Sequence, residues 1–125
     1  MNTIHSYKDL TVWQKSMDLV TKVYLFVGDF PKEEIFGLSS QIKRAAVSIP
    51  TNIAEGRFRG SRKDFTQFLR IAYASGAELE TELIIAENIN LGRKEKLEEV
   101  KLLLSEVMRM LNVMIGKLRS EQAKT

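Results

Sequence analysis

Residues 37–63 read GLSSQIKRAAVSIPTNIAEGRFRGSRK, and this stretch decides how the rest of the chain is interpreted. Apolar side chains recur in it every three or four positions, at Leu38, Ile42, Ala45 and Ile49. This spacing predicts one face of an α-helix over residues 39–55, with Gly56 as its left-handed C-terminal cap. Pro50 interrupts the pattern. Because proline lacks an N–H and crowds the carbonyl four residues earlier, we expect the helix to kink or stop beside it.

Three further helices are predicted on either side of this stretch. The same apolar spacing recurs over residues 9–28, 62–91 and 94–118. Ser61 is expected to cap the third helix, and residues 119–125 to form a frayed polar tail. Since no stretch alternates with a period of two, strand content should be near zero. The sequence thus predicts a single all-α domain, an antiparallel up-down-up-down four-helix bundle with a proline-kinked second helix.

The helix at residues 9–28 carries two apolar stripes rather than one. The first stripe steps by three and four and is expected to face the core, at Leu10, Trp13, Met17, Val20, Tyr24 and Val27. The second stripe lies on an adjacent face, at Val12, Leu19, Val23 and Phe26. A small four-helix monomer rarely needs both stripes, so the second is predicted to form an oligomer interface. A single wide core stripe is the alternative, and the pattern leaves both open.

Composition excludes several functional classes. At 125 residues without a cysteine, the chain forms no disulfide or thiolate metal site, which fits a reducing cytoplasm. No apolar run approaches the roughly 20 residues that span a bilayer, so we expect no membrane contact. His5 is the single histidine, which leaves no di-iron pair or serine-activating base. The acidic residues Glu78, Glu80 and Glu82 are expected to be solvated or paired. We therefore predict no enzyme activity, cofactor or metal.

Positive charge is concentrated in residues 37–63, which contain six Lys and Arg residues and a single acid, Glu55. Residues 64–92, by contrast, contain one basic and five acidic side chains. Such segregation permits a one-sided basic patch. The predicted nucleic-acid-binding residues are Lys43, Arg44, Arg57, Phe58, Arg59, Arg62 and Lys63. The arginines would hold phosphates, and Phe58 would stack on an unpaired base. Alternatively, Phe58 folds onto the bundle and the arginines pair with Glu55 or with acids of the helix expected at residues 62–91.

Several motifs resemble one family of four-helix bundle proteins, those encoded in 23S ribosomal RNA intervening sequences. They occur in order, at Gln41-Ile42, Arg44-Ala45-Ala46, Ser48-Ile49-Pro50 and Asn52-Ile53-Ala54-Glu55-Gly56, with LTVWQKSMDL and FPKEEIFGL before them. The resemblance covers nearly the whole chain and implies a ring-shaped homopentamer. It also implies kinship with the accessory variability determinant of diversity-generating retroelements, which works with a reverse transcriptase and nucleic acid. No catalytic residue comes with the resemblance.

These observations predict a non-enzymatic, oligomeric protein of the cytoplasm that binds RNA or DNA through a basic patch repeated around a ring. A reverse transcriptase is a candidate protein partner through the resemblance alone. The competing interpretation is a protein-interaction scaffold that makes no direct contact with nucleic acid.

Overall fold

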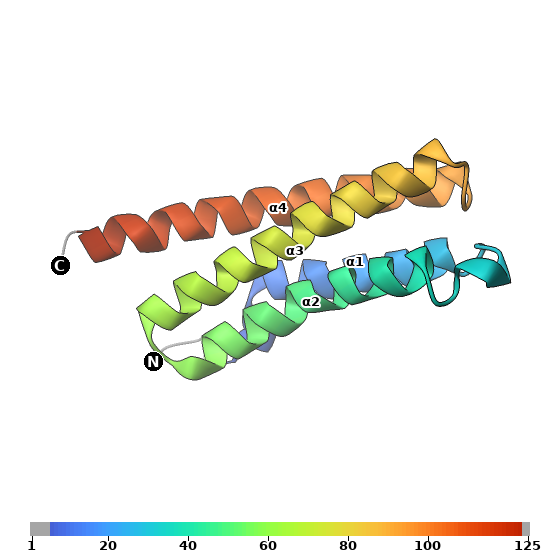
Figure 1. Ribbon diagram of the computed structural model, residues 1–125. Helices are drawn as coiled ribbons and strands as arrows, with labels where there is room; N and C mark the ends of the chain where they lie inside the picture. The colour runs from blue at the N-terminus through green and yellow to red at the C-terminus, as the bar shows by residue number, and fades with distance from the viewer. Residues whose placement is uncertain (1–5, 124–125) are drawn as a thin grey trace.

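The computed structural model describes residues 6–123, and within them the chain is all-helical with no strand. Its four long helices are α1 (Thr11–Val27), α2 (Leu38–Arg59), α3 (Arg62–Asn88) and α4 (Lys94–Ala123). Two short 3-10 helices precede α1 and α2, namely η1 (Tyr7–Asp9) and η2 (Lys32–Glu34). Consecutive helices run antiparallel, and each packs on the next while α4 returns to pack on α1 (Figure 1). The predicted all-α architecture of four helices is therefore confirmed.

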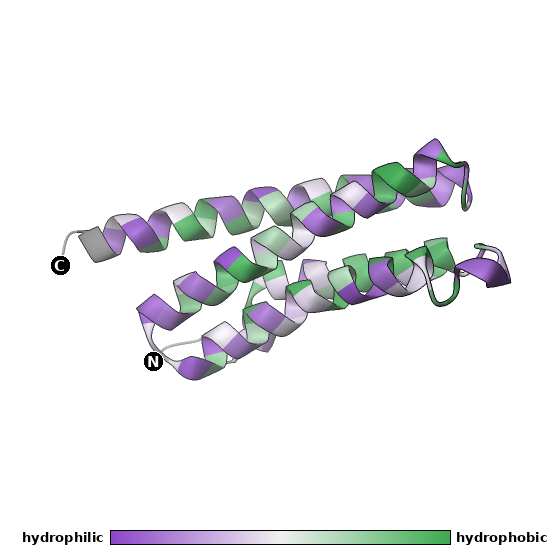
Figure 2. Ribbon diagram, viewed as in Figure 1, coloured by the Kyte–Doolittle hydropathy of each residue, from purple (hydrophilic) through white to green (hydrophobic). Residues whose placement is uncertain are grey.

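The core is a continuous set of apolar side chains contributed by all four helices. The largest fully buried residues are Leu19, Val23 and Phe26 of α1, Ile42, Ile49 and Ile53 of α2, Leu69, Leu79 and Leu83 of α3, and Val100 and Leu111 of α4. Hydrophilic residues gather instead where α2 turns into α3, the purple end of these two ribbons in Figure 2. None of the helices in the described part of the chain is both long and apolar enough to cross a membrane.

Helix α1 buries the stripe that was predicted to be an interface. Val12, Leu19, Val23 and Phe26 are at most 1% exposed inside the single chain. Met17 and Tyr24, from the stripe predicted to face the core, are 42% and 46% exposed. The interface predicted at the four buried positions is therefore corrected to a core stripe. There is a physical reason why this stripe is buried and the other is partly exposed. A buried Tyr24 hydroxyl would need a hydrogen-bond partner, whereas Leu19 and Phe26 carry no polar side-chain atom.

Helix α2 continues through Pro50 as far as Arg59, so the expectation that it might stop at the proline is wrong, and a kink there stays a prediction. Side chains just after the proline bond to carbonyls of the preceding turn: the Thr51 hydroxyl donates to the Val47 oxygen at 2.8 Å, and the Asn52 amide donates to the Ser48 oxygen at 2.8 Å. These donors bond to the two carbonyls that follow Ala46, the residue whose carbonyl Pro50 cannot bond because it has no N–H.

The C-terminal cap of α2 is Gly60 rather than the predicted Gly56. Gly60 has φ of +87°, the left-handed conformation that glycine adopts without strain. Gly56 is buried within the helix, where a Cβ would lie 2.5 Å from the Cβ of Phe68. The glycine therefore permits a close approach of α2 and α3, which the sequence pattern did not distinguish from a helix end.

Helix α3 begins as predicted, and α4 is longer than predicted. The Ser61 hydroxyl accepts a hydrogen bond from the Asp64 backbone N–H at 3.0 Å, which confirms the predicted cap. Helix α4 runs past Leu118 through residue 123, so the expected fraying is wrong for residues 119–123, and residues 124–125 lie outside the described chain.

Candidate nucleic-acid interface

Five of the seven predicted nucleic-acid-binding residues meet at the tight turn between α2 and α3. We call these residues the basic turn: Arg57, Phe58, Arg59, Arg62 and Lys63. The first three form the last turn of α2 and the other two begin α3, with only Gly60 and Ser61 between them. The left-handed Gly60 reverses the chain within two residues, so both groups lie at the same end of the bundle (Figure 1).

Phe58 points into solvent, with 86% of its surface exposed. The alternative in which this ring folds back onto the bundle is therefore wrong. The other half of that alternative holds for Arg59, which pairs with Glu55, whereas Arg62 pairs with an acid of α4 instead of one of α3. The Arg59 guanidinium lies 3.1 Å from the Glu55 carboxylate and 4.9 Å from the centre of the Phe68 ring. The Arg62 guanidinium lies 3.4 Å from the carboxylate of Glu121 on α4.

The two ion pairs of the basic turn are weak enough for a phosphate to replace the carboxylate in each. Each partner side chain of Arg59–Glu55 and Arg62–Glu121 is about half exposed. Ion pairs of this kind contribute at most about 1 kcal/mol, because water screens the charges and two long side chains lose freedom. A polyanion that contacts several cations at once, including the exposed Lys63, can therefore displace them.

The other two predicted residues are not part of the basic turn. Lys43 and Arg44 lie near the middle of α2, about 20 Å along the helix from Arg57 at 1.5 Å per residue. The Lys43 ammonium sits 5.0 Å from the centre of the Tyr24 ring, a cation–π contact between α2 and α1. Arg44 lines a hollow of about 400 Å³ with Gln41, Ala45, Ser48 and Glu78. The structure thus separates the predicted site into two regions.

Sequence reasoning missed a residue that lies beside the basic turn. Tyr7, in η1, lines two hollows of about 400 Å³ and 440 Å³, and Phe58 lines both of them as well. The Tyr7 ring meets the Trp13 ring edge-on with 5.4 Å between their centres, which ties η1 to α1. Tyr7 and Phe58 are 51 positions apart in the sequence and share no helical pattern, so no local signal connected them.

Glu82 departs from the expectation that the acids of α3 are solvated or paired. It is 5% exposed, and its Oε1 atom has no hydrogen-bond partner among the described residues. Burial, and secondarily the charge of Glu78 one turn earlier, raise the pKa of Glu82 from 4.5 to about 6. Glu82 is buried because of the helix face on which it lies. The Ser48 and Ser75 hydroxyls meet at 2.8 Å between α2 and α3, and Glu82 comes seven residues after Ser75 on the same face of α3.

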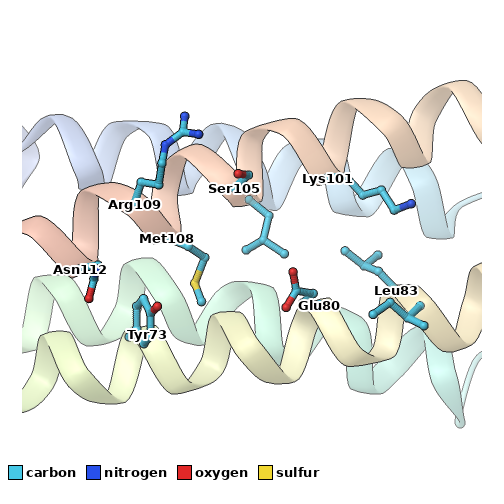
Figure 3. A pocket seen from close by; sticks show the side chains of 10 residues that line it. Tyr73, Glu80, Leu83, Lys101, Ser105, Met108, Arg109 and Asn112 are labelled. Carbon is cyan, nitrogen blue, oxygen red and sulfur yellow. The ribbon is translucent and has the colours of Figure 1, made fainter.

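A hollow of about 520 Å³ lies between α3 and α4 (Figure 3). Met108 extends from α4 toward α3 next to Tyr73, while Glu80 and Ser105 line the hollow farther along. Gly76 makes room for this methionine, since a Cβ there would collide with the Met108 sulfur. The lining mixes apolar groups with charges of both signs.

Within residues 6–121, whose side chains are described, no group of three or more acidic or histidine side chains is placed to hold a metal ion.

The fold and the turn together define a class of protein, a helical bundle that offers an exposed basic and aromatic surface. The family model of the 23S rRNA-intervening sequence protein matches residues 8–113, and the chain belongs to this family.

A solved structure supports the same assignment. This chain is similar to a protein of unknown function from the S23 ribosomal protein family of Bacteroides thetaiotaomicron, with 28% sequence identity and a TM-score of 0.74. The alignment covers 84% of this chain and 98% of the other. No curated protein matches this chain.

Proposed function

We propose that this protein is a non-enzymatic accessory protein of the cytoplasm that binds RNA or DNA through the basic turn. The observation that carries the proposal is the exposed Phe58 ring among four cationic residues at one end of the bundle. Cations bind phosphates regardless of sequence, and an exposed aromatic ring adds a stacking surface for a base. The family name, which refers to a ribosomal RNA sequence, is consistent with this role.

Removing two cations from the basic turn should weaken RNA binding and its dependence on salt. For the double variant Arg62→Gln/Lys63→Gln, we expect the slope of log affinity against log salt concentration to fall by about one to two units, because about 0.7 of a counterion is released per phosphate contact on a single strand and about 0.9 on duplex DNA. Fluorescence anisotropy of a labelled RNA at 50, 100 and 200 mM salt, concentrations chosen on the same principle, measures this slope.

The matched control is Arg93→Gln/Lys94→Gln, which removes the same charge at the α3–α4 connection, the opposite end of the bundle (Figure 1). This variant should change the slope less than the basic-turn variant. Equal slopes for both variants would place the contact elsewhere, and RNA affinity that is independent of salt would contradict the proposal.

The finer assembly implied by the resemblance, a ring-shaped homopentamer, is also part of the proposal. It is supported by large apolar side chains exposed on α3 and α4, including Ile84 at 48%, Leu102 at 75% and Val113 at 60%. Single exposed residues of this kind are ordinary, but several on adjacent helices are typical of interaction surfaces. A ring would repeat the basic turn and add weak contacts together. Kinship with retroelement accessory proteins, and a reverse transcriptase as partner, rest on the resemblance alone.

The exposed position of Leu102 makes assembly testable without unfolding the chain. Leu102→Glu should lower the mass measured by light scattering while the circular dichroism spectrum stays unchanged, because this side chain is 75% exposed in the single chain. A stable monomer of the unmodified protein at micromolar concentration would contradict the ring.

The same apolar surface also favours a second candidate function, a scaffold that binds another protein. Binding of a protein partner that survives nuclease treatment would support that function instead.

A further inference from the structure

The surroundings of Phe58 distinguish it from an ordinary exposed side chain. Two hollows open beside it, and Tyr7 and Phe58 line both of them. The first hollow, about 400 Å³, is lined by Ser6 and Arg57 in addition to this pair. The second, about 440 Å³, is lined by Ala54, Glu55 and Arg59 in addition to the pair. Each hollow thus combines aromatic surface with one arginine, and in the second hollow a phosphate would have to replace the Glu55 carboxylate as the partner of Arg59.

This combination matches the chemistry of a nucleotide whose base is unpaired. A base can stack on the phenyl ring only if its face is accessible, and a guanidinium beside the ring can hold the adjoining phosphate. In a duplex the faces of the bases are already covered by their neighbours, so a duplex would use the cations and leave Phe58 without a function.

We infer that Phe58 separates two successive unpaired bases, one in each hollow, and that the ligand of the basic turn is therefore single-stranded nucleic acid rather than a duplex. Tyr7 forms part of the wall of both hollows, and Arg57 and Arg59 each contact the backbone beside one base. The inference rests on the proposed function, since it names the class of nucleic acid that the same turn binds.

The chain supplies a matched control at the other end of the bundle. Phe36 is 97% exposed and lies between η2 and α2, far from the basic turn (Figure 1). Its neighbours along the chain include Glu33 and Glu34 instead of cations, so it lacks a partner for phosphate. Phe58→Leu and Phe36→Leu thus each remove a largely exposed ring without changing charge, and both should fold like the unmodified protein.

The experiment compares two labelled RNAs of the same length, one single-stranded and one duplex, by fluorescence anisotropy at a fixed low salt concentration. We expect the unmodified protein to prefer the single strand. Phe58→Leu should lower the affinity for the single strand by about tenfold, within the range for one base–aromatic stack, and leave the duplex nearly unchanged. Phe36→Leu should alter neither affinity.

Trp13 provides a second, independent signal. It is the single tryptophan of the chain and contacts the Tyr7 ring, so filling the hollows should change its fluorescence. The expected change appears with the single strand and is lost with Phe58→Leu. A single strand that binds without any change in Trp13 fluorescence, and equally well to Phe58→Leu, would overturn the inference.

Two outcomes separate this inference from the proposed function. If both RNAs bind with the same salt-dependent affinity and Phe58→Leu weakens neither, the inference fails while the basic turn remains a phosphate-binding site. If neither RNA binds, or binding is independent of salt, the proposed function fails and the inference fails with it.

Discussion

Replacing Val23 with glutamate should unfold the chain. The Val23 side chain is 0% exposed in the core of the bundle. A carboxylate placed there would have to lose its water without gaining a partner, which costs several kcal/mol, comparable with the roughly 5–15 kcal/mol that stabilises a whole domain. We expect loss of the cooperative thermal transition and of most helical signal in circular dichroism at neutral pH.

The neighbouring residue provides the control for this substitution. Tyr24 is 46% exposed, so Tyr24→Glu keeps its carboxylate in water and loses mainly the contact with Lys43, about 1 kcal/mol or less. This variant should stay folded. A Val23→Glu protein that kept its helices but changed its oligomeric state would show instead that the stripe at Val12, Leu19, Val23 and Phe26 is an interface.

Replacing Glu82 with glutamine should stabilise the protein at neutral pH. Because the pKa of Glu82 is raised from 4.5 to about 6, the folded protein binds its proton more tightly than the unfolded chain does. The ionised carboxylate therefore destabilises the fold above pH 6, by at most about 2 kcal/mol for a shift of this size, and the cost disappears as pH falls toward 4.5. Glutamine removes the charge at every pH.

Urea unfolding at pH 7.5, above that interval, and at pH 4.5, its lower limit, tests the sign. Glu82→Gln should raise the free energy of unfolding at the higher pH and differ little from the unmodified protein at the lower one. Glu80→Gln, at an exposed position on the same helix, should have little effect at either pH. A Glu82→Gln variant that is less stable at pH 7.5 would mean that the carboxylate has a stabilising partner.

The spacing of apolar residues and the capping residues at helix ends predicted much of the fold. They failed where two different structures are compatible with the same sequence pattern. The four helices follow from three- and four-residue steps, and the Ser61 cap follows from its own local hydrogen bond. The buried face of α1 did not follow, because both of its stripes have helical spacing and only packing against α2 and α4 chooses between them. Gly56 was assigned to a helix end because, in the sequence, a glycine that lets a neighbouring helix approach cannot be told from a glycine that caps a helix.

The candidate site was predictable where its residues are neighbours in the chain. Phe58 and Arg62 are four positions apart around a turn, so their proximity follows from the sequence. The pairing of Arg62 with Glu121 spans 59 positions and depends on α4 continuing beyond its predicted end. The position of Tyr7 beside Phe58 likewise depends on how η1 meets the end of α2.

An even number of antiparallel helices brings the start of α1 and the end of α4 to the same end of the bundle as the basic turn (Figure 1). Tyr7 and Glu121 already touch that region through the hollows and the ion pair. A fusion partner, purification tag or surface tether attached at either terminus would therefore crowd the proposed nucleic-acid interface. Dyes and immobilisation chemistry belong on the α1–α2 or α3–α4 connection, where the bundle would present the basic turn outward.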